Sequence, residues 1–210
     1  FTNVPADDLA DATPDDLAGA ARSLFRFAGE RKPGKPKVRV YNPDQRRDGW
    51  SLPHSVVEIV NDDMPFLVDS VTAELMRLET ESRLVIHPIF ACKRDKAGRL
   101  EEIGAPGDRH DGSHPESIMQ VWISEVSERR HAEIVAGLEA ILLDVRAAVP
   151  GWRAMRQRCR DLVEELERRP PPLPKAEVTE ALRFLEWLDD NNFTYLGYRE
   201  YSFAGQGGKA

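Results

Sequence analysis

One short turn gathers the side chains best suited to chemistry. It follows a run of β-branched residues at 56–60 and contains two adjacent aspartates. Paired carboxylates can serve as general acid and base, and free N–H groups at the start of a helix can hold a ligand carboxylate. No base, nucleophile or glycine-rich phosphate loop accompanies the acids in the sequence, so we predict no catalytic residue. The candidate ligand-binding turn consists of Asn61, Asp62, Asp63, Met64, Pro65 and Phe66.

A strand and a helix must position this turn. The run at 56–60 has the composition of a strand that is buried on both faces. Pro65 suits the first turn of a helix. Apolar residues then recur at helical spacing: Val68, Val71, Leu75 and Leu78. Asp62 and Asp63 would lie where the helix dipole favours negative charge, so a purely structural turn is the alternative. The two aspartates would also repel a ligand carboxylate unless they bind the ligand's amino group.

A second group of polar residues lies in one loop: His110, Asp111, His114 and Glu116. A His-x-x-x-His pair ligates zinc when a helix carries both histidines. Gly112 and Pro115 oppose a helix at this place, so we predict a solvated loop and no metal site. His87 precedes Pro88 in an apolar run, and this setting favours a structural histidine over a general base.

Hydrophobic periodicity predicts the other elements. A helix begins at its cap, Thr13, and stops near Gly29. The predicted strands are 38–41, 83–94, 100–103, 117–126 and 193–203, with turns at 42–44 and 95–98 and a loop at 104–116. Pro88 lacks a donor for the sheet and implies an edge or a bulge. The remaining helices are 134–145, 152–166 and 178–188, the first two separated by a break at Pro150-Gly151.

This order of elements predicts an α+β sandwich, with helices on one face of a mainly antiparallel sheet. We divide the chain into an N-terminal helix and connector, 1–37, and the α+β domain, 38–148. A helical extension follows at 149–190, with a proline-rich linker at 168–174. Residues 191–210 form a closing strand or the start of a next domain.

Composition narrows the classes of partner. The formal net charge is −7, and basic residues are not clustered, which argues against nucleic acid or an anionic membrane surface as a partner. The aromatic residues of 193–203 therefore favour a sheet face or a subunit contact over a base-stacking platform. Cys92 and Cys159 read as buried free thiols, which indicates a reducing, cytoplasmic setting. No apolar run reaches the ~20 residues of a membrane span, and the chain reads as a fragment of something longer.

Several long and unusual segments of the sequence resemble the N-terminal region of the large bacterial NAD-specific glutamate dehydrogenases. They are VVEIVNDDMPFLVDSVTAEL, HPIF, FTYLGYREY, DDLAGAARSLFRFA and VRVYNP. The resemblance implies an ACT-like (ferredoxin-like) domain with a C-terminal helical extension. It implies a non-catalytic regulatory or assembly segment, with no cofactor of its own. The parent enzyme would use NAD to oxidise L-glutamate to 2-oxoglutarate and ammonium.

The resemblance also implies partners and a site. ACT domains bind amino acids between the first strand and helix, often at a dimer interface, and usually carry Gly just after the proline of that turn. Phe66 stands there instead, so its ring would crowd the ligand. We therefore expect contacts with the rest of the polypeptide and with other subunits of a homo-oligomer. The alternative is an amino-acid sensor that binds its effector at Asn61–Phe66.

Overall fold

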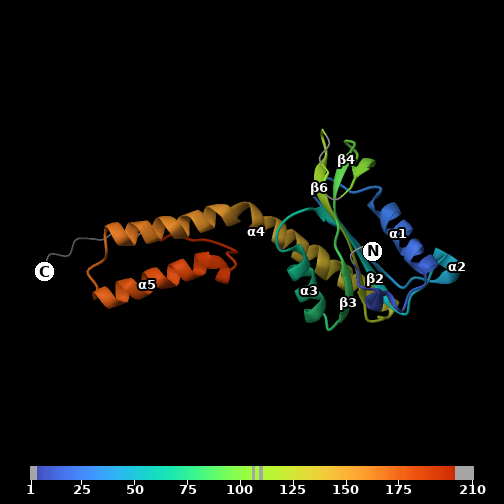
Figure 1. The fold of residues 1–210 in the computed structure, drawn as a ribbon, viewed down its shortest axis with the longest axis horizontal. Coiled ribbons are helices and arrows are strands. Elements are labelled where there is room, and N and C mark those ends of the chain that lie inside the picture. Colours follow the sequence, from blue (N-terminus) through green and yellow to red (C-terminus); the bar gives the residue numbers. More distant parts are fainter. Residues whose placement is uncertain (1–3, 106, 109–110, 202–210) are drawn as a thin grey trace. The chain divides into compact units, whose positions relative to one another are not determined.

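The computed structural model of the chain describes residues 4–105, 107–108 and 111–201 (Figure 1). The helices are η1 (Ala6–Leu9), α1 (Pro14–Ala28), α2 (Gln45–Asp48), α3 (Leu67–Arg77), α4 (Glu128–Arg168), α5 (Lys175–Trp187) and η2 (Leu188–Asn192). The strands are β1 (Lys37–Tyr41), β2 (Ser55–Asp62), β3 (Ser82–Ile86), β4 (Ile89–Arg94), β5 (Leu100–Gly104) and β6 (His114–Ile123). The chain forms two compact units, which we call the sheet unit (Phe1–Val145) and the helical unit (Arg146–Ala210).

The six strands of the sheet unit form one antiparallel sheet, which confirms the α+β class. Its order is β1-β2-β6-β4-β5, and β3 also pairs with β6. The central strand is β6. It pairs with the whole of β2 along one edge and with β3 and β4 along the other. β2 lies between β1 and this central strand, so the turn that follows β2 starts in the interior of the sheet and not at an edge strand.

The predicted single strand at 83–94 is wrong, because the chain forms two strands, β3 and β4, with Pro88 between them. Proline has no N–H for the ladder, and its carbonyl instead accepts a hydrogen bond from Ile118 at 3.2 Å. Both strands still pair with β6. β6 itself starts at His114, so Pro115 and Glu116 belong to a strand and not to the predicted loop.

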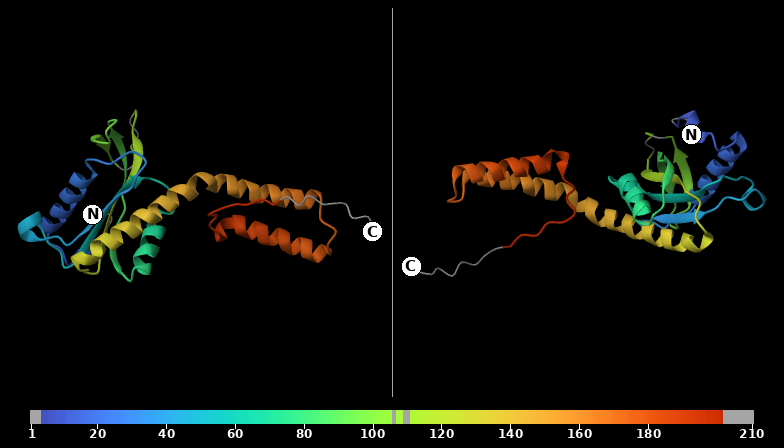
Figure 2. Two further views of the ribbon diagram at one scale, coloured as in Figure 1. Left: turned by 180° about the vertical axis from the view of Figure 1, so that it is seen from behind. Right: turned by 90° about the horizontal axis from the view of Figure 1, so that it is seen from below.

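The helices cover both faces of the sheet (Figures 1 and 2). The α3 helix and the first part of α4 lie on one face, as predicted, and α1 lies on the other. Successive side chains of β2 point to opposite faces, so Val56 and Val60 join core clusters with Ala20 and Ala28 of α1. The N-terminal helix, which the sequence placed outside the α+β domain, thus completes its second layer.

Local sequence explains how α1 is seated. The predicted cap is present, with the Asp16 N–H donating to Thr13 Oγ1 at 3.2 Å and the Thr13 N–H donating to the Asp16 carboxylate at 3.2 Å. Gly19 faces Trp50 so closely that a Cβ on Gly19 would lie 2.4 Å from the Trp50 side chain. Trp50 follows α2, a short helix that is capped by Asp44 and begins directly after the predicted turn at 42–44.

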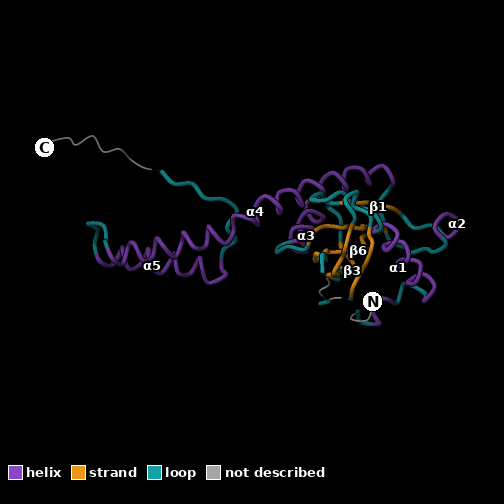
Figure 3. Tube along the Cα trace, turned by 90° about the horizontal axis from the view of Figure 1, so that it is seen from above, coloured by secondary structure: helices purple, strands orange, loops and turns teal. Residues whose placement is uncertain are grey.

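The helical unit departs from the prediction at two places. Pro150 lies inside α4 and does not break it. The apolar positions 145, 148, 152 and 155 stay in phase across the proline, so one stripe continues where two helices were expected. Residues 193–201, predicted as part of a closing strand, form no strand and appear as loop in Figure 3. No described helix is long and apolar enough to cross a membrane.

Candidate functional site

The predicted ligand-binding turn joins β2 to α3 in the sheet unit. Asn61 is fully buried at the end of β2, and Asp62 forms an ion pair with Arg31. The Asp63 N–H donates to the carbonyl of Pro115, the second residue of β6, at 3.0 Å. Packing and hydrogen bonds with distant segments therefore hold the first half of the turn. Arg31 already balances the charge of the Asp62 carboxylate, which weakens its attraction for the amino group of a ligand.

Phe66, not Pro65, is the residue that caps α3, so the predicted start of this helix at Pro65 is wrong. Phe66 has φ +72°, in the left-handed region, where side chains with a Cβ are disfavoured and glycine is not. Its carbonyl accepts a hydrogen bond from the Ser70 N–H at 3.0 Å. The phenylalanine ring is half-buried. The turn thus has the backbone of a glycine turn but carries an aromatic side chain.

Two buried carboxylates on the α1 face of the sheet were not predicted as a site. Glu116 of β6 is 3% exposed and lies between two arginines. Arg94 donates to both of its oxygens at 2.7 Å, and Arg31 donates at 2.8 Å. Burial by itself would raise the pKa of Glu116, but Arg94 and Arg31 outweigh burial and hold this pKa below its usual value. Arg31 also pairs with Asp62, so it ties the candidate turn to β6.

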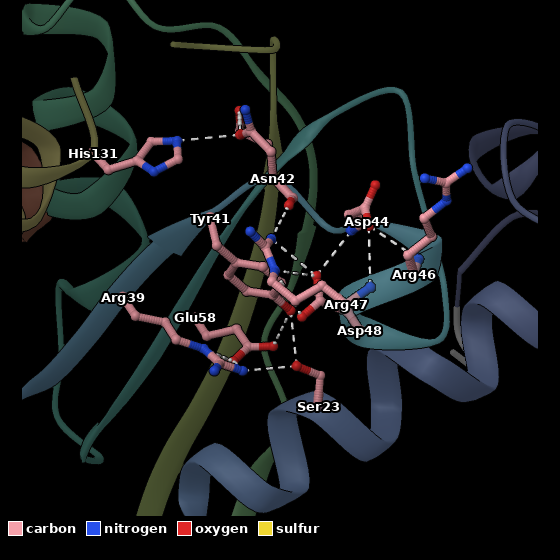
Figure 4. A network of polar contacts seen from close by, with 11 residues as sticks. Ser23, Arg39, Tyr41, Asn42, Asp44, Arg46, Arg47, Asp48, Glu58 and His131 are labelled. Carbon is pink, nitrogen blue, oxygen red and sulfur yellow. Dashed lines mark hydrogen bonds and ion pairs between the residues drawn. The ribbon is translucent and has the colours of Figure 1, made fainter. Parts of the chain in front are cut away.

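Glu58 of β2 is the second buried carboxylate, with a fully buried side chain whose contacts with Arg39 and Tyr41 are drawn in Figure 4. Arg39 donates Nε and Nη2 to one oxygen at 2.8 and 2.6 Å. Tyr41 and Gln120 donate to the other oxygen at 2.9 and 3.2 Å. Arg39 Nη2 also donates to Ser23 Oγ at 2.7 Å, which ties the network to α1. Burial, and then the charge of Glu58, raises the pKa of Tyr41.

In both networks the carboxylate links segments that are far apart in the sequence. Each buried carboxylate meets at least one guanidinium, which is permanently charged and cannot accept a proton. The signal that could have found Glu58 was present, since an acid inside a buried β-branched run requires a partner. Cys92 lies nearby, and burial raises the pKa of its thiol to about 11, so this thiol is protonated at neutral pH.

The other predicted polar residues take structural places. His87 Nε2 lies 2.7 Å from Ser117 Oγ, consistent with a structural histidine, and burial lowers its pKa. Of the loop considered for zinc, His114 and Glu116 belong to β6, and His110 lies outside the described residues. No group of three or more potential metal ligands occurs among the residues that the structure describes.

An apolar cavity of about 340 Å³ lies on the α1 face, and no residue of the candidate turn lines it. Its lining consists of Ala21, Leu24, Phe25, Ala28, Ile86, Pro88, Phe90, Ile103, Ile118 and Gln120. Gln120 is the one polar residue of this lining, and its amide already donates to Glu58. The cavity can accommodate an apolar group, but its lining offers no partner for the charged ends of an amino acid.

The comparison with known families decides the identity of the sheet unit. A family model described as "Glutamate dehydrogenase, ACT1 domain" matches residues 1–138. The chain belongs to this family. The matched residues end within α4, so they contain the complete sheet and the candidate turn. The predicted resemblance to the N-terminal region of the large glutamate dehydrogenases is therefore confirmed.

The relatives extend the likeness through the helical unit. The NAD-specific glutamate dehydrogenase of Halomonas elongata is 39% identical over 203 residues, which are 96% of this chain and 13% of the relative. That of Pseudomonas aeruginosa is 34% identical over 208 residues, 97% of this chain and 13% of the relative. That of Mycobacterium tuberculosis is 28% identical over 210 residues, 93% of this chain and 12% of the relative. The chain thus spans only a small part of the length of these glutamate dehydrogenases.

Proposed function

We propose that this chain is a non-catalytic assembly and regulatory module of a large NAD-dependent glutamate dehydrogenase. The whole enzyme would convert L-glutamate, NAD and water to 2-oxoglutarate, ammonium and NADH. NAD would bind in another part of the polypeptide, and the module would contact that polypeptide and other subunits. The match to the ACT1 domain and the names of the relatives support this proposal.

The observation that carries the non-catalytic role is the use of the buried charges. Glu58 and Glu116 are the buried carboxylates of the sheet centre, and arginines of the same chain neutralise both of them. A general acid or base must be able to exchange its proton near neutral pH. A carboxylate whose pKa is lowered by two guanidinium groups, as for Glu116, stays ionised and holds segments together instead.

A second candidate function is amino-acid sensing at Asn61–Phe66. The left-handed backbone at Phe66 supports it, because such a backbone lets a ligand approach when the residue is glycine. The half-buried ring and the Asp62–Arg31 ion pair oppose it. Calorimetric titration with amino acids, for the wild-type chain and for Phe66→Gly, separates the two roles. Absence of binding heat in both proteins would eliminate sensing at this turn.

The non-catalytic role is tested on the whole enzyme and on this chain. We expect no NADH from glutamate and NAD with the 210-residue chain alone. We expect an enzyme that lacks residues 1–145 to keep its chemistry but to lose part of its assembly or its response to effectors. NADH production by the isolated chain would overturn the first part. An unchanged number of subunits in the assembled enzyme, together with an unchanged kinetic response to effectors after the deletion, would overturn the second.

A further inference from the structure

The α5 helix of the helical unit carries two apolar stripes. The first consists of the half-buried residues Val178, Leu182 and Leu185 at helical spacing, and it continues at Leu188 of η2. It faces α4, where Cys159 Sγ donates to the Leu185 carbonyl at 3.6 Å. The second stripe is Phe184 and Trp187, which are 58% and 51% exposed. Their rings stack with centroids 6.2 Å apart and planes inclined by 16°. Phe184 and Trp187 lie outside the face that packs on α4, so only a further partner can remove these two rings from water.

The segment after α5 adds further exposed apolar side chains. These are Phe193, Leu196, Tyr198 and Tyr201, between 46% and 74% exposed. Arg158 of α4 donates to the Tyr198 hydroxyl at 3.0 Å, so this loop segment runs along α4. Large exposed apolar patches are uncommon on proteins that function alone and mark surfaces for interaction.

The helical unit also lacks an interior of its own. Among those of its residues whose side chains are described, Cys159 alone is buried. Two helices and one loop segment bury too little apolar surface to offset the entropy of ordering them. Polar contacts hold the unit together instead, notably Arg156 and Arg160, which each donate to Asp189 at 2.7 Å. Asp189 is 19% exposed and Arg160 is 51% exposed, so water screens these ion pairs and they contribute less stability than fully buried ones. A partner must therefore complete this unit.

We propose that Phe184 and Trp187 dock onto a part of the same glutamate dehydrogenase polypeptide that lies outside this chain. The proposal rests on the proposed function, because it assumes the large parent enzyme. The family match stops at residue 138, but the relatives match 203 to 210 residues, through the helical unit, and most of their length lies beyond this match. Covalent linkage gives the remaining polypeptide a millimolar effective concentration. Two rings on one helix are too small a surface to recruit a second copy against that competition.

Hydrogen exchange measured by mass spectrometry tests the docking directly. The amides of α5 are compared between the 210-residue chain and the whole enzyme. We expect exchange to be at least tenfold slower in the whole enzyme, because docking buries the helix. Equal exchange in the two proteins would overturn the proposal. Protection that already exists in the 210-residue chain and rises with its concentration would assign the surface to a second copy and overturn the proposal as well.

A double variant ties the protection to the two rings. Phe184→Gln with Trp187→Gln removes the stripe but keeps residues that favour a helix. In the whole enzyme this variant should lose the slow exchange of α5. The matched control is Met76→Gln on α3 of the sheet unit, where Met76 is 74% exposed, and it should leave α5 unchanged. Unchanged protection in the double variant would refute the docking surface.

The failure of this proposal can be told from the failure of the proposed function. The deletion of residues 1–145 leaves α5 in the enzyme and tests only the sheet unit. The exchange of α5 reports only on the helical unit. An enzyme whose assembly survives the deletion, yet whose α5 is protected, would refute the proposed function and keep the docking surface.

Discussion

The sheet unit and the helical unit bury their side chains to very different degrees. In the sheet unit, the apolar residues at the centre of β2 and β6 are at most 3% exposed, and helices cover both faces of the sheet. In the helical unit, α5 has no buried residue, and Phe184 and Trp187 are more than half exposed. The comparison teaches that the first unit carries its own core, whereas the second depends on a partner.

Each unit contains a carboxylate that pairs with two arginines, and this motif is buried in the sheet unit but partly exposed in the helical unit. A carboxylate lies between two arginines in each, Glu116 in the sheet unit and Asp189 in the helical unit. Glu116 and its partners are at most 9% exposed. Asp189 is 19% exposed, and one of its arginines, Arg160, is 51% exposed. Geometry is similar in the two motifs, so burial decides how much each one contributes to stability.

Removal of Glu116, the carboxylate of the buried motif, should have the largest effect on stability. Glu116→Ala leaves Arg94 buried without a carboxylate and leaves Arg31 with Asp62 alone, and we expect a loss of about 3–5 kcal/mol in the free energy of unfolding. The matched control, Asp189→Ala, should cost no more than about 1 kcal/mol because water can replace the lost contact. Urea denaturation followed by tryptophan fluorescence measures both. Equal losses for the two variants would break the comparison.

Two glycines within helices provide the next test. A Cβ on Gly19 would lie 2.4 Å from Trp50, whereas a Cβ on Gly151 would meet only the Met155 methyl group at 3.6 Å. Gly19→Ala should cost about 1–3 kcal/mol through overpacking. Gly151→Ala should be neutral or stabilise by up to about 1 kcal/mol, because alanine is the better helix former. Thermal unfolding measures the two changes, and opposite signs are expected. A destabilised Gly151→Ala would indicate a packed interior that we do not see.

The strained backbone of Phe66 in the candidate turn should have a smaller effect on stability. Phe66→Ala and Phe66→Gly both remove the half-buried ring, but only glycine relieves the left-handed backbone at φ +72°. The glycine variant should therefore be about 1 kcal/mol more stable than the alanine variant. Urea midpoints measured under identical conditions provide the difference. Equal stability of the two variants would remove the strain from our description of the turn.

The pH dependence from His87 should be the smallest effect. Burial lowers the pKa of His87 in the folded protein below the value of 6.5 that applies to the unfolded chain. The unfolded chain therefore binds a proton first, and stability decreases as the pH falls below 6.5. His87→Gln, which keeps a partner for Ser117, should weaken this decrease. An identical pH profile of the unfolding free energy in wild type and variant would contradict the assignment.

Local signals explain the parts of the fold that the sequence predicted well. The Thr13 cap, the β-branched run of β2 and the turn at 95–98 each depend on a few neighbouring residues. The errors arose where distant segments decide the outcome. Glu116 was placed in a loop because its partner Arg31 is 85 residues away. The same holds for Glu58, whose burial becomes intelligible only when β1 brings Arg39 beside it.

The candidate turn shows the same limit at the level of function. Its location between strand and helix was predicted, but the left-handed backbone of Phe66 and the Asp62–Arg31 ion pair were not. A sequence pattern places a turn between two elements; it does not specify which of its side chains is already engaged. The helical unit was predicted as an extension, yet its dependence on a partner follows only from the exposed rings of α5.

Limited proteolysis of the 210-residue chain tests the contrast between the two units most directly. Lys175 and Arg183 on α5 and Arg199 in the loop after it are exposed, and trypsin should cut at these sites before it cuts the sheet unit, because the helical unit opens easily without its partner. The mass spectrum should then show a resistant fragment that contains residues 4–145. Digestion of the sheet unit as fast as the helical unit, or resistance of the whole chain, would contradict our account.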